Sequence, residues 1–433
     1  MTELIDLPLR AQLSLIDSGA AQPQDIDAAT CARIARRDPD LRSIVHMGAT
    51  DARCPIGIKD IFDVDGMPTR CGSHAHRGTG VEATAVTRLR AAGLTPRAKL
   101  ATYEYALTGP AWDQPNPPAR NPWNVEHITG GSSSGSAAAV AGGLFRAALG
   151  TDTGGSIRAP AAYCGIVGLK PTHGLVPEDG CFPLSPSLDV IGPLAACVED
   201  AAFVMEALAP ESAATRDLGQ GIAGLRIGYA RDWFATDKDC HPDLLRAMDD
   251  AAALLTRLGA RIDLVTLSPY APLEAAGCVI IQAEAWEIHK GRLATSWEEY
   301  GVDARRNLFT GAILTPEHVT AAMQLARSFR AEVDENLAEY SALLAPTTLA
   351  PAPKFSDFED GPFWTAMRTL PFNMTGHPAI SVPCGFAGNG LPLGMQLIGA
   401  RNAEALLCRI GHAFEQASDS TARPALAPDP ANA

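Results

Sequence analysis

Two short loops rich in glycine and serine carry the residues whose types and spacing could do chemistry. The first is Gly130-Gly131-Ser132-Ser133-Ser134-Gly135-Ser136, and the second is Gly150-Thr151-Asp152-Thr153-Gly154-Gly155-Ser156. A third piece, Lys59, lies upstream between apolar residues in Pro55-Ile56-Gly57-Ile58-Lys59-Asp60. Nucleophilic acyl transfer needs a serine nucleophile, a relay for its proton and backbone N–H groups for the developing oxyanion. These three segments contain all of those parts.

The second loop predicts an oxyanion-binding nest. Because glycine tolerates unusual φ values, successive N–H groups can point at one spot beside Ser156. The donors would be the backbone N–H groups of Thr153, Gly154, Gly155 and Ser156. Taken alone, the same residues also fit a glycine turn capped by serine.

Lys59 and Ser132 each have a functional and a structural interpretation. A lysine works as a base only when neutral, and burial among Ile56, Ile58 and Phe62 could lower its pKa from about 10.4 toward 7–8. A lone lysine of this kind is more often a surface residue covering apolar neighbours. Ser132 could simply cap the following Ala-rich helix, although Ser134 or Ser136 could do that instead.

The elements that must position these residues follow an α/β rhythm. We expect an N-terminal helical segment over 1–45, followed by one compact domain over 46–416. Strands are expected over 54–64, 225–229, 261–265, 343–348, 380–383 and 393–398, with helices over 84–92, 136–149, 242–258 and 404–414. A helical middle is expected over about 270–340, and 417–433 reads as a disordered tail.

Composition excludes several classes of protein. The net charge of −14 argues against a nucleic-acid surface, and no apolar run of about 18 residues predicts a membrane span. The N-terminus does not read as a signal peptide. Ten cysteines occur without a Cys-x-x-Cys spacing, which favours a reducing cytoplasm over a disulfide framework or zinc site.

The run GGSSSGSAAAVA, then GTDTGGSIRAPAAYCGIVGLKPTHG and SLDVIGP, closely resembles the amidase signature family. PIGIKDIFDVDGMPT upstream and PFNMTGHPAISVPCGF with GLPLGMQLIG downstream match other parts of that family. The resemblance covers about 50–205 and 343–415, and the segment 210–340 is only weakly matched. It implies a single α/β domain with a central mixed sheet covered by helices on both faces.

Carried over by position, the resemblance implies a Ser-Ser-Lys triad in which Ser156 is the nucleophile, Ser132 a bridging serine with a cis peptide bond, and Lys59 the general base. Asp152 and Arg158 would support the loop, and Ser133 would be a neighbouring hydrogen-bond partner. The activity implied is hydrolysis of a C–N bond in a small-molecule amide, urea-like compound or carbamate through an acyl-enzyme. No cofactor or metal is implied.

Two departures bear on substrate choice. Ser134 stands where the family usually has glycine, and Lys99-Leu100-Ala101-Thr102-Tyr103-Glu104-Tyr105-Ala106 replaces a stretch that often lines the substrate site in relatives. We expect a substrate pocket lined by residues of 100–106, of the helical middle and of 364–372. The candidate substrate-binding residues are Tyr103, Gly131, Phe309 and Trp364, with Phe363 as a further aromatic wall.

Other functions stay open at this point. Gly131-Ser132-Ser133-Ser134-Gly135 satisfies G-x-S-x-G, so an α/β-hydrolase-type esterase would use Ser133 with His377 or His412 as base. A non-catalytic amidase-like subunit is another alternative, although no triad residue is missing. His74-x-His76 fits an exposed turn better than a metal site. The expected partner is a small-molecule amide, without nucleic acid or membrane, and a homodimer is left open because many relatives are dimers.

Overall fold

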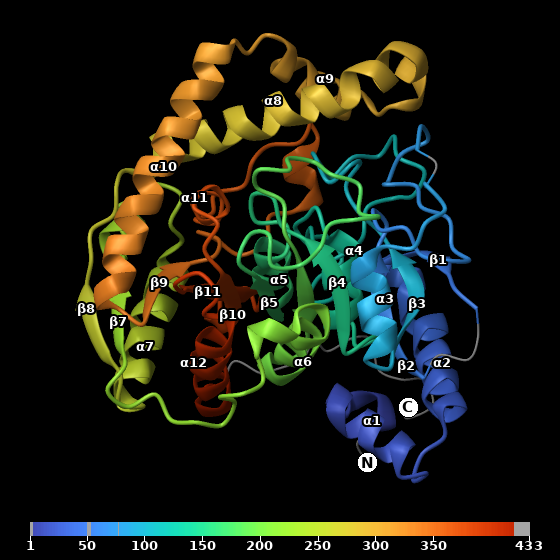
Figure 1. Ribbon diagram of the computed structural model, residues 1–433, viewed down its shortest axis with the longest axis horizontal. Coiled ribbons are helices and arrows are strands. Elements are labelled where there is room, and N and C mark those ends of the chain that lie inside the picture. Colours follow the sequence, from blue (N-terminus) through green and yellow to red (C-terminus); the bar gives the residue numbers. More distant parts are fainter. Residues whose placement is uncertain (1–2, 50–52, 77, 420–433) are drawn as a thin grey trace.

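The computed structural model describes residues 3–49, 53–76 and 78–419 and has a long mixed β-sheet at its centre (Figure 1). Among these residues the sheet contains eleven strands in the order β1-β3-β2-β4-β6-β5-β10-β11-β9-β7-β8. Parallel pairs lie toward both ends, where β2 pairs with β3 and β4, and β7 pairs with β8 and β9. The strands are β1 (Ile44–Met47), β2 (Cys54–Lys59), β3 (Leu94–Leu100), β4 (Ala147–Thr151), β5 (Val167–Lys170), β6 (Ile191–Ala195), β7 (Arg226–Tyr229), β8 (Arg261–Leu264), β9 (Ala342–Pro346), β10 (Ala379–Phe386) and β11 (Pro392–Ile398).

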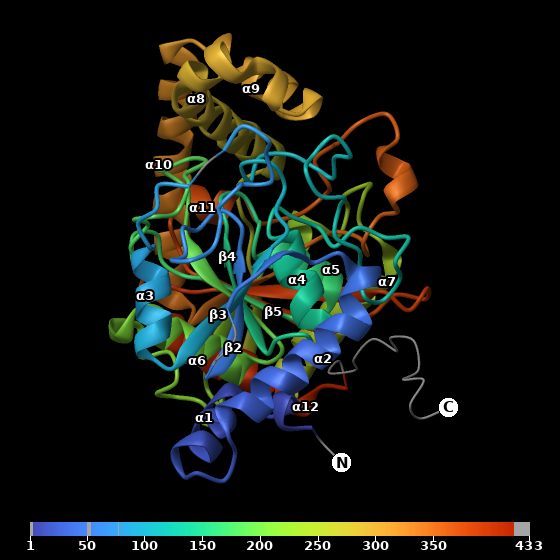
Figure 2. The ribbon, with the colours of Figure 1, turned by 90° about the vertical axis from the view of Figure 1, so that its right-hand side faces the viewer.

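Helices cover both faces of the sheet. The α-helices are α1 (Leu9–Asp17), α2 (Pro23–Leu41), α3 (Thr84–Ala91), α4 (Ser134–Ala141), α5 (Arg158–Cys164), α6 (Val198–Leu208), α7 (Pro242–Arg257), α8 (Tyr270–Ser296), α9 (Val302–Ala312), α10 (Pro316–Glu339), α11 (Pro371–Met374) and α12 (Glu404–Ala417). Short 3-10 helices are η1 (Leu4–Asp6), η2 (Pro210–Ser212), η3 (Arg231–Trp233), η4 (Trp297–Glu299) and η5 (Phe355–Phe358). In Figure 2, α3 lies on one side of the sheet and the pair α4 and α5 on the other. The predicted single-domain α/β fold with a central mixed sheet is therefore confirmed.

The helices α8 and α9 lie beyond one end of the strands, and α10 runs back alongside the sheet to contact β9; we call these three helices the helical cap (Figure 1). Both α9 and α10 pack against α8. The approach of α9 is so close that a Cβ on Gly311 would lie 2.1 Å from the Gln282 carbonyl oxygen. Helices therefore occupy the segment where the sequence predicts a helical middle.

Most predicted elements occur at their expected places. The strands predicted over 225–229, 261–265, 380–383 and 393–398 are present, and the last two pair in antiparallel fashion as β10 and β11. The strand predicted over 54–64 ends earlier, at Lys59, where the chain turns away from the sheet. The predicted tail beyond 419 lies outside the described residues.

The helix predicted over 136–149 is present, but its predicted end is wrong. The helix α4 ends at Ala141, because Gly142 and Gly143 follow and Gly143 adopts φ = +71°. The chain then enters β4, which pairs with β2 on one side and β6 on the other. In an Ala-rich apolar run, the spacing of apolar and polar residues cannot distinguish a buried helix from a buried strand. Only the glycine pair therefore indicated the boundary between α4 and β4.

Candidate active site

Lys59 is the last residue of β2, a strand buried along its whole length between β3 and β4. Its side chain is completely buried. The Nζ atom lies 2.8 Å from the Ser132 Oγ and 2.8 Å from the Thr151 Oγ1, the latter at the end of β4. Because β2 and β4 are parallel, their carboxyl ends meet at one edge of the sheet, and this places Lys59 and Thr151 together.

Burial lowers the pKa of Lys59 to about 7, although Cys181, Asp189 and Asp152 nearby favour its charged form. The adjacent carboxylate does not cancel this effect. Asp60 forms an ion pair with Lys99 at 2.8 Å, consistent with alternation of side chains along a strand. The lysine is therefore close to half neutral near pH 7, which is the condition a general base must meet.

Ser132 lies in the loop before α4, and its peptide bond with Gly131 is cis. Ser133, at the start of α4, is turned into the protein. Its Oγ donates to the Thr151 carbonyl oxygen at 3.2 Å, and its side chain is fully buried. Ser134 and Ser136 do not cap the helix as expected, because their hydroxyls donate to the carbonyl oxygens of Ala101 and Leu149.

Ser156 follows β4 in the loop that leads to α5, and it lines the same cavity as Ser132. The two loops are joined by a hydrogen bond from the Ser133 N–H to the Ser156 carbonyl oxygen at 3.3 Å. No hydrogen bond of the Ser156 hydroxyl occurs within the described part of the chain. The hydroxyl is thus free to meet a molecule in the cavity.

The peptide plane between Gly154 and Gly155 is held at both ends. The Gly154 carbonyl oxygen accepts a hydrogen bond from the Thr369 Oγ1 at 2.6 Å, and the Gly155 N–H donates to the Asp152 Oδ1 at 2.8 Å. This corrects the expected donor set, because the Gly155 N–H is already engaged. Within the described residues, the N–H groups of Thr153, Gly154 and Ser156 have no such partner, so these three are available as donors.

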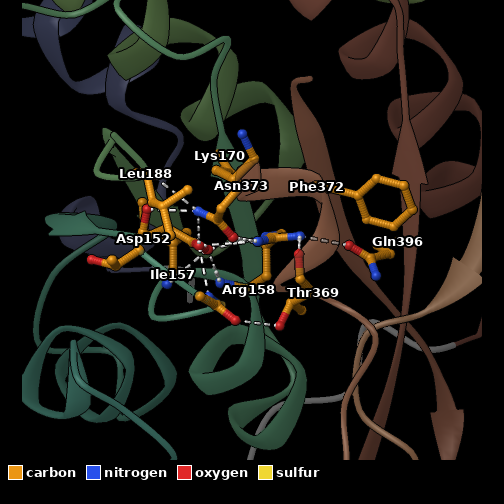
Figure 3. A network of polar contacts seen from close by, with 12 residues as sticks. Asp152, Ile157, Arg158, Lys170, Leu188, Thr369, Phe372, Asn373 and Gln396 are labelled. Atoms are coloured by element: carbon orange, nitrogen blue, oxygen red, sulfur yellow. Dashed lines mark hydrogen bonds and ion pairs between the residues drawn. The ribbon is translucent and has the colours of Figure 1, made fainter. Parts of the chain in front are cut away.

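A buried ion pair holds this loop from behind (Figure 3). Asp152 and Arg158 lie 3.0 Å apart and are completely buried. Burial alone would raise the pKa of Asp152, but the Arg158 guanidinium outweighs it and lowers this pKa to about 2. Arg158 also donates to the Thr369 carbonyl oxygen and to the side chains of Gln396 and Asn373. These contacts join the 152–158 loop to segments more than 200 residues away.

A cavity of about 210 Å³ opens beside the two serines. Tyr103, Gly131 and Trp364, three of the predicted substrate-binding residues, line it, and so does Phe363. The helical cap contributes Cys278, Ile281, Gln282 and Asn307 to the wall. The stretches that the sequence predicted to form the pocket thus do meet here.

The Amidase family model matches residues 52–408 of the chain. The chain belongs to the amidase signature family. It is an amidohydrolase by this membership. A glutamyl-tRNA(Gln) amidotransferase subunit of Roseiflexus castenholzii is 35% identical over 97% of each of the two chains.

Solved structures agree with this membership. A glutamyl-tRNA(Gln) amidotransferase subunit from Thermotoga maritima superposes with a TM-score of 0.84 at 30% identity, covering 98% of this chain and 99% of that one. The peptide amidase from Stenotrophomonas maltophilia gives a TM-score of 0.82 at 28% identity, covering 98% of this chain and 99% of that one. The family therefore includes both free amidases and a component of an amidotransferase.

The position of Phe309 corrects the predicted pocket. It is 45% exposed on α9 and packs against Trp286 and Trp297, outside the cavity wall. Asn307, two residues earlier on the same helix, faces the cavity instead. The aromatic character of Phe309 suggested a pocket wall, but the weakly matched middle of the sequence did not show which face of α9 points inward.

The elbow serine of the α/β-hydrolase alternative is badly placed. Ser133 does not line the cavity, and its hydroxyl is occupied by Thr151. Neither candidate base lies at the cavity wall, and His377 instead contacts Asp334 at 3.0 Å. The strand that precedes this loop, β3, ends at Leu100, far from Ser133 in the chain, so it does not lead into the serine as an elbow requires.

The structure also shows where the two histidines of the metal-site hypothesis lie. His74 is exposed as expected, but His76 is buried and lies 3.0 Å from Arg292 through its Nδ1. In the described ranges, no group of three or more histidine, cysteine, aspartate or glutamate side chains could hold a metal ion. None of the helices in these ranges is long and apolar enough to cross a membrane.

Four residues of the site carried no sequence signal as functional candidates. Thr369, Asn373 and Gln396 reach the loop at 152–158 through hydrogen bonds, yet they lie in segments that resembled the family only as a whole. Thr151 is another, although it stands within the second glycine loop. These residues are distinguished by being polar and buried beside the glycine loops, and this property is visible only once the fold is known.

Proposed function

We propose that this protein hydrolyses the C–N bond of a small-molecule amide through an acyl-enzyme on Ser156, with urea-like compounds and carbamates as further substrates of the same chemistry. The observation that carries the proposal is the contact between the Lys59 Nζ and the Ser132 Oγ at 2.8 Å. A buried lysine with a pKa of about 7 meets a serine hydroxyl there, at the wall of a cavity that also holds Ser156.

The proposed reaction begins with neutral Lys59. One of its N–H groups is used by Thr151, and its lone pair takes the proton of Ser132. Ser132 in turn takes the proton of Ser156, whose Oγ attacks the amide carbonyl carbon. The negative charge that forms on the carbonyl oxygen is stabilised by backbone N–H groups of Thr153, Gly154 and Ser156.

Breakdown of the tetrahedral intermediate returns the proton through Ser132 to the amide nitrogen, and the amine leaves. Water then attacks the acyl-enzyme, giving its proton to the same relay, and the acid is released while the Ser156 hydroxyl is restored. Every step uses protons already held by the two serines, the lysine and the attacking water. No cofactor enters the scheme.

The variants Ser156→Ala and Ser133→Ala test the assignment. Ser156→Ala should lower kcat on an amide substrate by at least about 10⁴-fold, since it removes the nucleophile. Ser133→Ala should cost far less, because its hydroxyl only braces Thr151. Near-normal turnover by Ser156→Ala, or a larger loss in Ser133→Ala, would refute the mechanism.

A second candidate is a role as one component of an amidotransferase. It is favoured by the similarity to the Roseiflexus castenholzii protein over nearly the whole chain. The same chemistry would then cleave a carboxamide, pass the ammonia that leaves to a partner subunit, and still use water to release the acid from Ser156. The expected homodimer and the expected cytoplasmic location stay predictions.

A further inference from the structure

The cavity beside Ser132 and Ser156 has a distinctive charge pattern. No lining residue within the described part of the chain is aspartate, glutamate, lysine, arginine or histidine. This contrasts with a chain that has 49 acidic and 35 basic residues. Resting on the proposed function, we infer that the substrate is uncharged throughout the part that enters the cavity, and that Gln282 and Asn307 select for a neutral polar group.

Charged side chains around the cavity have partners of their own, and Lys59, which does not line it, is fully buried and bonded to Ser132 and Thr151. Glu274 of α8 accepts hydrogen bonds from the Tyr270 hydroxyl at 3.0 Å and from the Trp364 side chain, and Trp364 lines the cavity whereas Glu274 does not. Asp152 and Arg158 satisfy each other behind the loop. A charged substrate group would lose its hydration here without gaining a counter-ion, which is costly.

Aromatic rings form flat walls against both glycine loops. A Cβ on Gly131 would lie 2.3 Å from the Tyr103 ring, and a Cβ on Gly109 would lie 2.6 Å from it, so this ring is held between two backbone segments. A Cβ on Gly154 would likewise lie 2.9 Å from the Trp364 ring. Rigid rings beside the reacting serines favour an apolar alkyl or aryl group next to the scissile bond.

The helical cap supplies the polar part of the wall. Gln282 on α8 and Asn307 on α9 line the cavity, and the side-chain amide of neither residue has a hydrogen-bond partner within the described ranges. An amide both donates and accepts hydrogen bonds but carries no charge. These two side chains can therefore pair with a carbonyl, hydroxyl or second amide of the substrate. An amino-acid amide such as glutamine, with an ammonium and a carboxylate group, lacks partners in this wall.

Three 4-nitroanilides of nearly equal size test the inference. Their acyl groups are butyryl, which is neutral, succinyl, which is anionic, and 3-aminopropanoyl, which is cationic. Each is measured for hydrolysis and for slowing the reaction of Ser156 with a fluorophosphonate probe. The wild-type protein should favour the butyryl compound over both charged ones by at least about 100-fold in kcat/KM. Protection of Ser156 should follow the same order.

Isosteric charge variants make the test specific. Gln282→Glu should raise the kcat/KM ratio of the 3-aminopropanoyl to the butyryl compound by at least about tenfold, since it gives the ammonium group a partner. Gln324→Glu, at an exposed site on α10, adds the same charge elsewhere and should leave the ratio unchanged.

The outcomes separate this inference from the proposed function. Failure of the probe to label Ser156 would contradict the proposed function itself. Suppose that Ser156 is labelled but the charged and neutral compounds differ by less than tenfold in kcat/KM or in protection of Ser156. The inferred substrate class is then wrong. It is also wrong if none of the three compounds protects Ser156. An equal response of Gln282→Glu and Gln324→Glu would remove Gln282 from the recognition of the substrate.

Discussion

At the scale of single residues, the proposed mechanism depends on the protonation state of Lys59. Burial lowers the pKa of this lysine to about 7, so the side chain is neutral above that pH and charged below it. Only the neutral form can take the Ser132 proton. Wild-type kcat/KM should therefore fall about tenfold per unit below pH 7, whereas Lys59→Met should lose at least about 10³-fold and lack this acid limb.

Lys170 provides the control for this pH profile. It is also fully buried, and burial lowers its pKa to about 7 as well, but it donates to the Pro171 carbonyl oxygen and does not line the cavity. Lys170→Met should keep the acid limb of kcat/KM near pH 7. If Lys170→Met loses the limb and Lys59→Met retains it, the base has been assigned to the wrong lysine.

Residues that carry chemistry were the most predictable part of this protein. Ser132, Ser156 and Lys59 stand in segments whose composition suits one reaction, and the structure brings the Lys59 Nζ to the Ser132 Oγ. Gly155 shows the limit of such reasoning. Its place in the glycine run suggested a free N–H, but only the fold reveals that the Asp152 carboxylate accepts that hydrogen bond.

At the scale of elements, the turn between β4 and α5 must present its N–H groups in one direction. Thr369 fixes that direction, because its hydroxyl binds the Gly154 carbonyl oxygen at 2.6 Å and keeps this oxygen from turning toward the cavity. Thr369→Val removes the hydrogen bond but keeps the shape. It should lower kcat by about 10- to 100-fold with little change in KM, as expected for a weakened oxyanion hole.

Thr369→Ser separates positioning from packing, since it keeps the hydroxyl and removes a methyl group. We expect it to retain most of the kcat that Thr369→Val loses. A rise in KM with unchanged kcat in Thr369→Val would show that Thr369 acts on substrate binding instead, and the positioning role would be incorrect.

Element boundaries were less predictable than residue chemistry. Ala137 to Leu149 reads as one apolar run, yet it contains the end of α4, a glycine turn and most of β4. On α9, Asn307 rather than Phe309 faces the cavity. Both errors have the same cause. The elements packed against a segment determine whether it forms a helix or a strand and which of its faces points inward.

At the scale of the whole molecule, Arg158 joins distant parts of the chain behind the 152–158 loop. It binds Asp152 nearby and reaches Thr369, Asn373 and Gln396. Their separation in sequence explains why this network could not be predicted before the fold was known. The network can form because α5, which begins at Arg158, packs against β11, which contains Gln396.

Breaking this pair should destabilise the protein. Arg158→Met leaves the buried Asp152 carboxylate unpaired and should lower the free energy of unfolding at pH 7 by about 3–5 kcal/mol, measured by urea denaturation. The pKa of Asp152 is depressed to about 2 in the folded protein. The ion pair therefore stabilises the folded protein fully above about pH 4, and this stabilisation decreases as the pH falls toward 2. The difference between wild type and variant should shrink over that interval.

The double variant Asp152→Asn/Arg158→Met is the matched control, because it leaves no buried charge without a partner. It should be more stable at pH 7 than Arg158→Met alone. A double variant that is less stable by the sum of two independent losses would mean that Asp152 and Arg158 do not act as a pair.

The most direct test of the central claim is the site of the covalent intermediate. The protein is mixed with an amide that it hydrolyses, quenched with acid during turnover, and digested for peptide mass mapping. We expect one acyl group attached to Ser156, and its loss in Ser156→Ala. An acyl group on Ser133 or Ser132, or hydrolysis that proceeds at full rate in Ser156→Ala, would contradict the proposed mechanism.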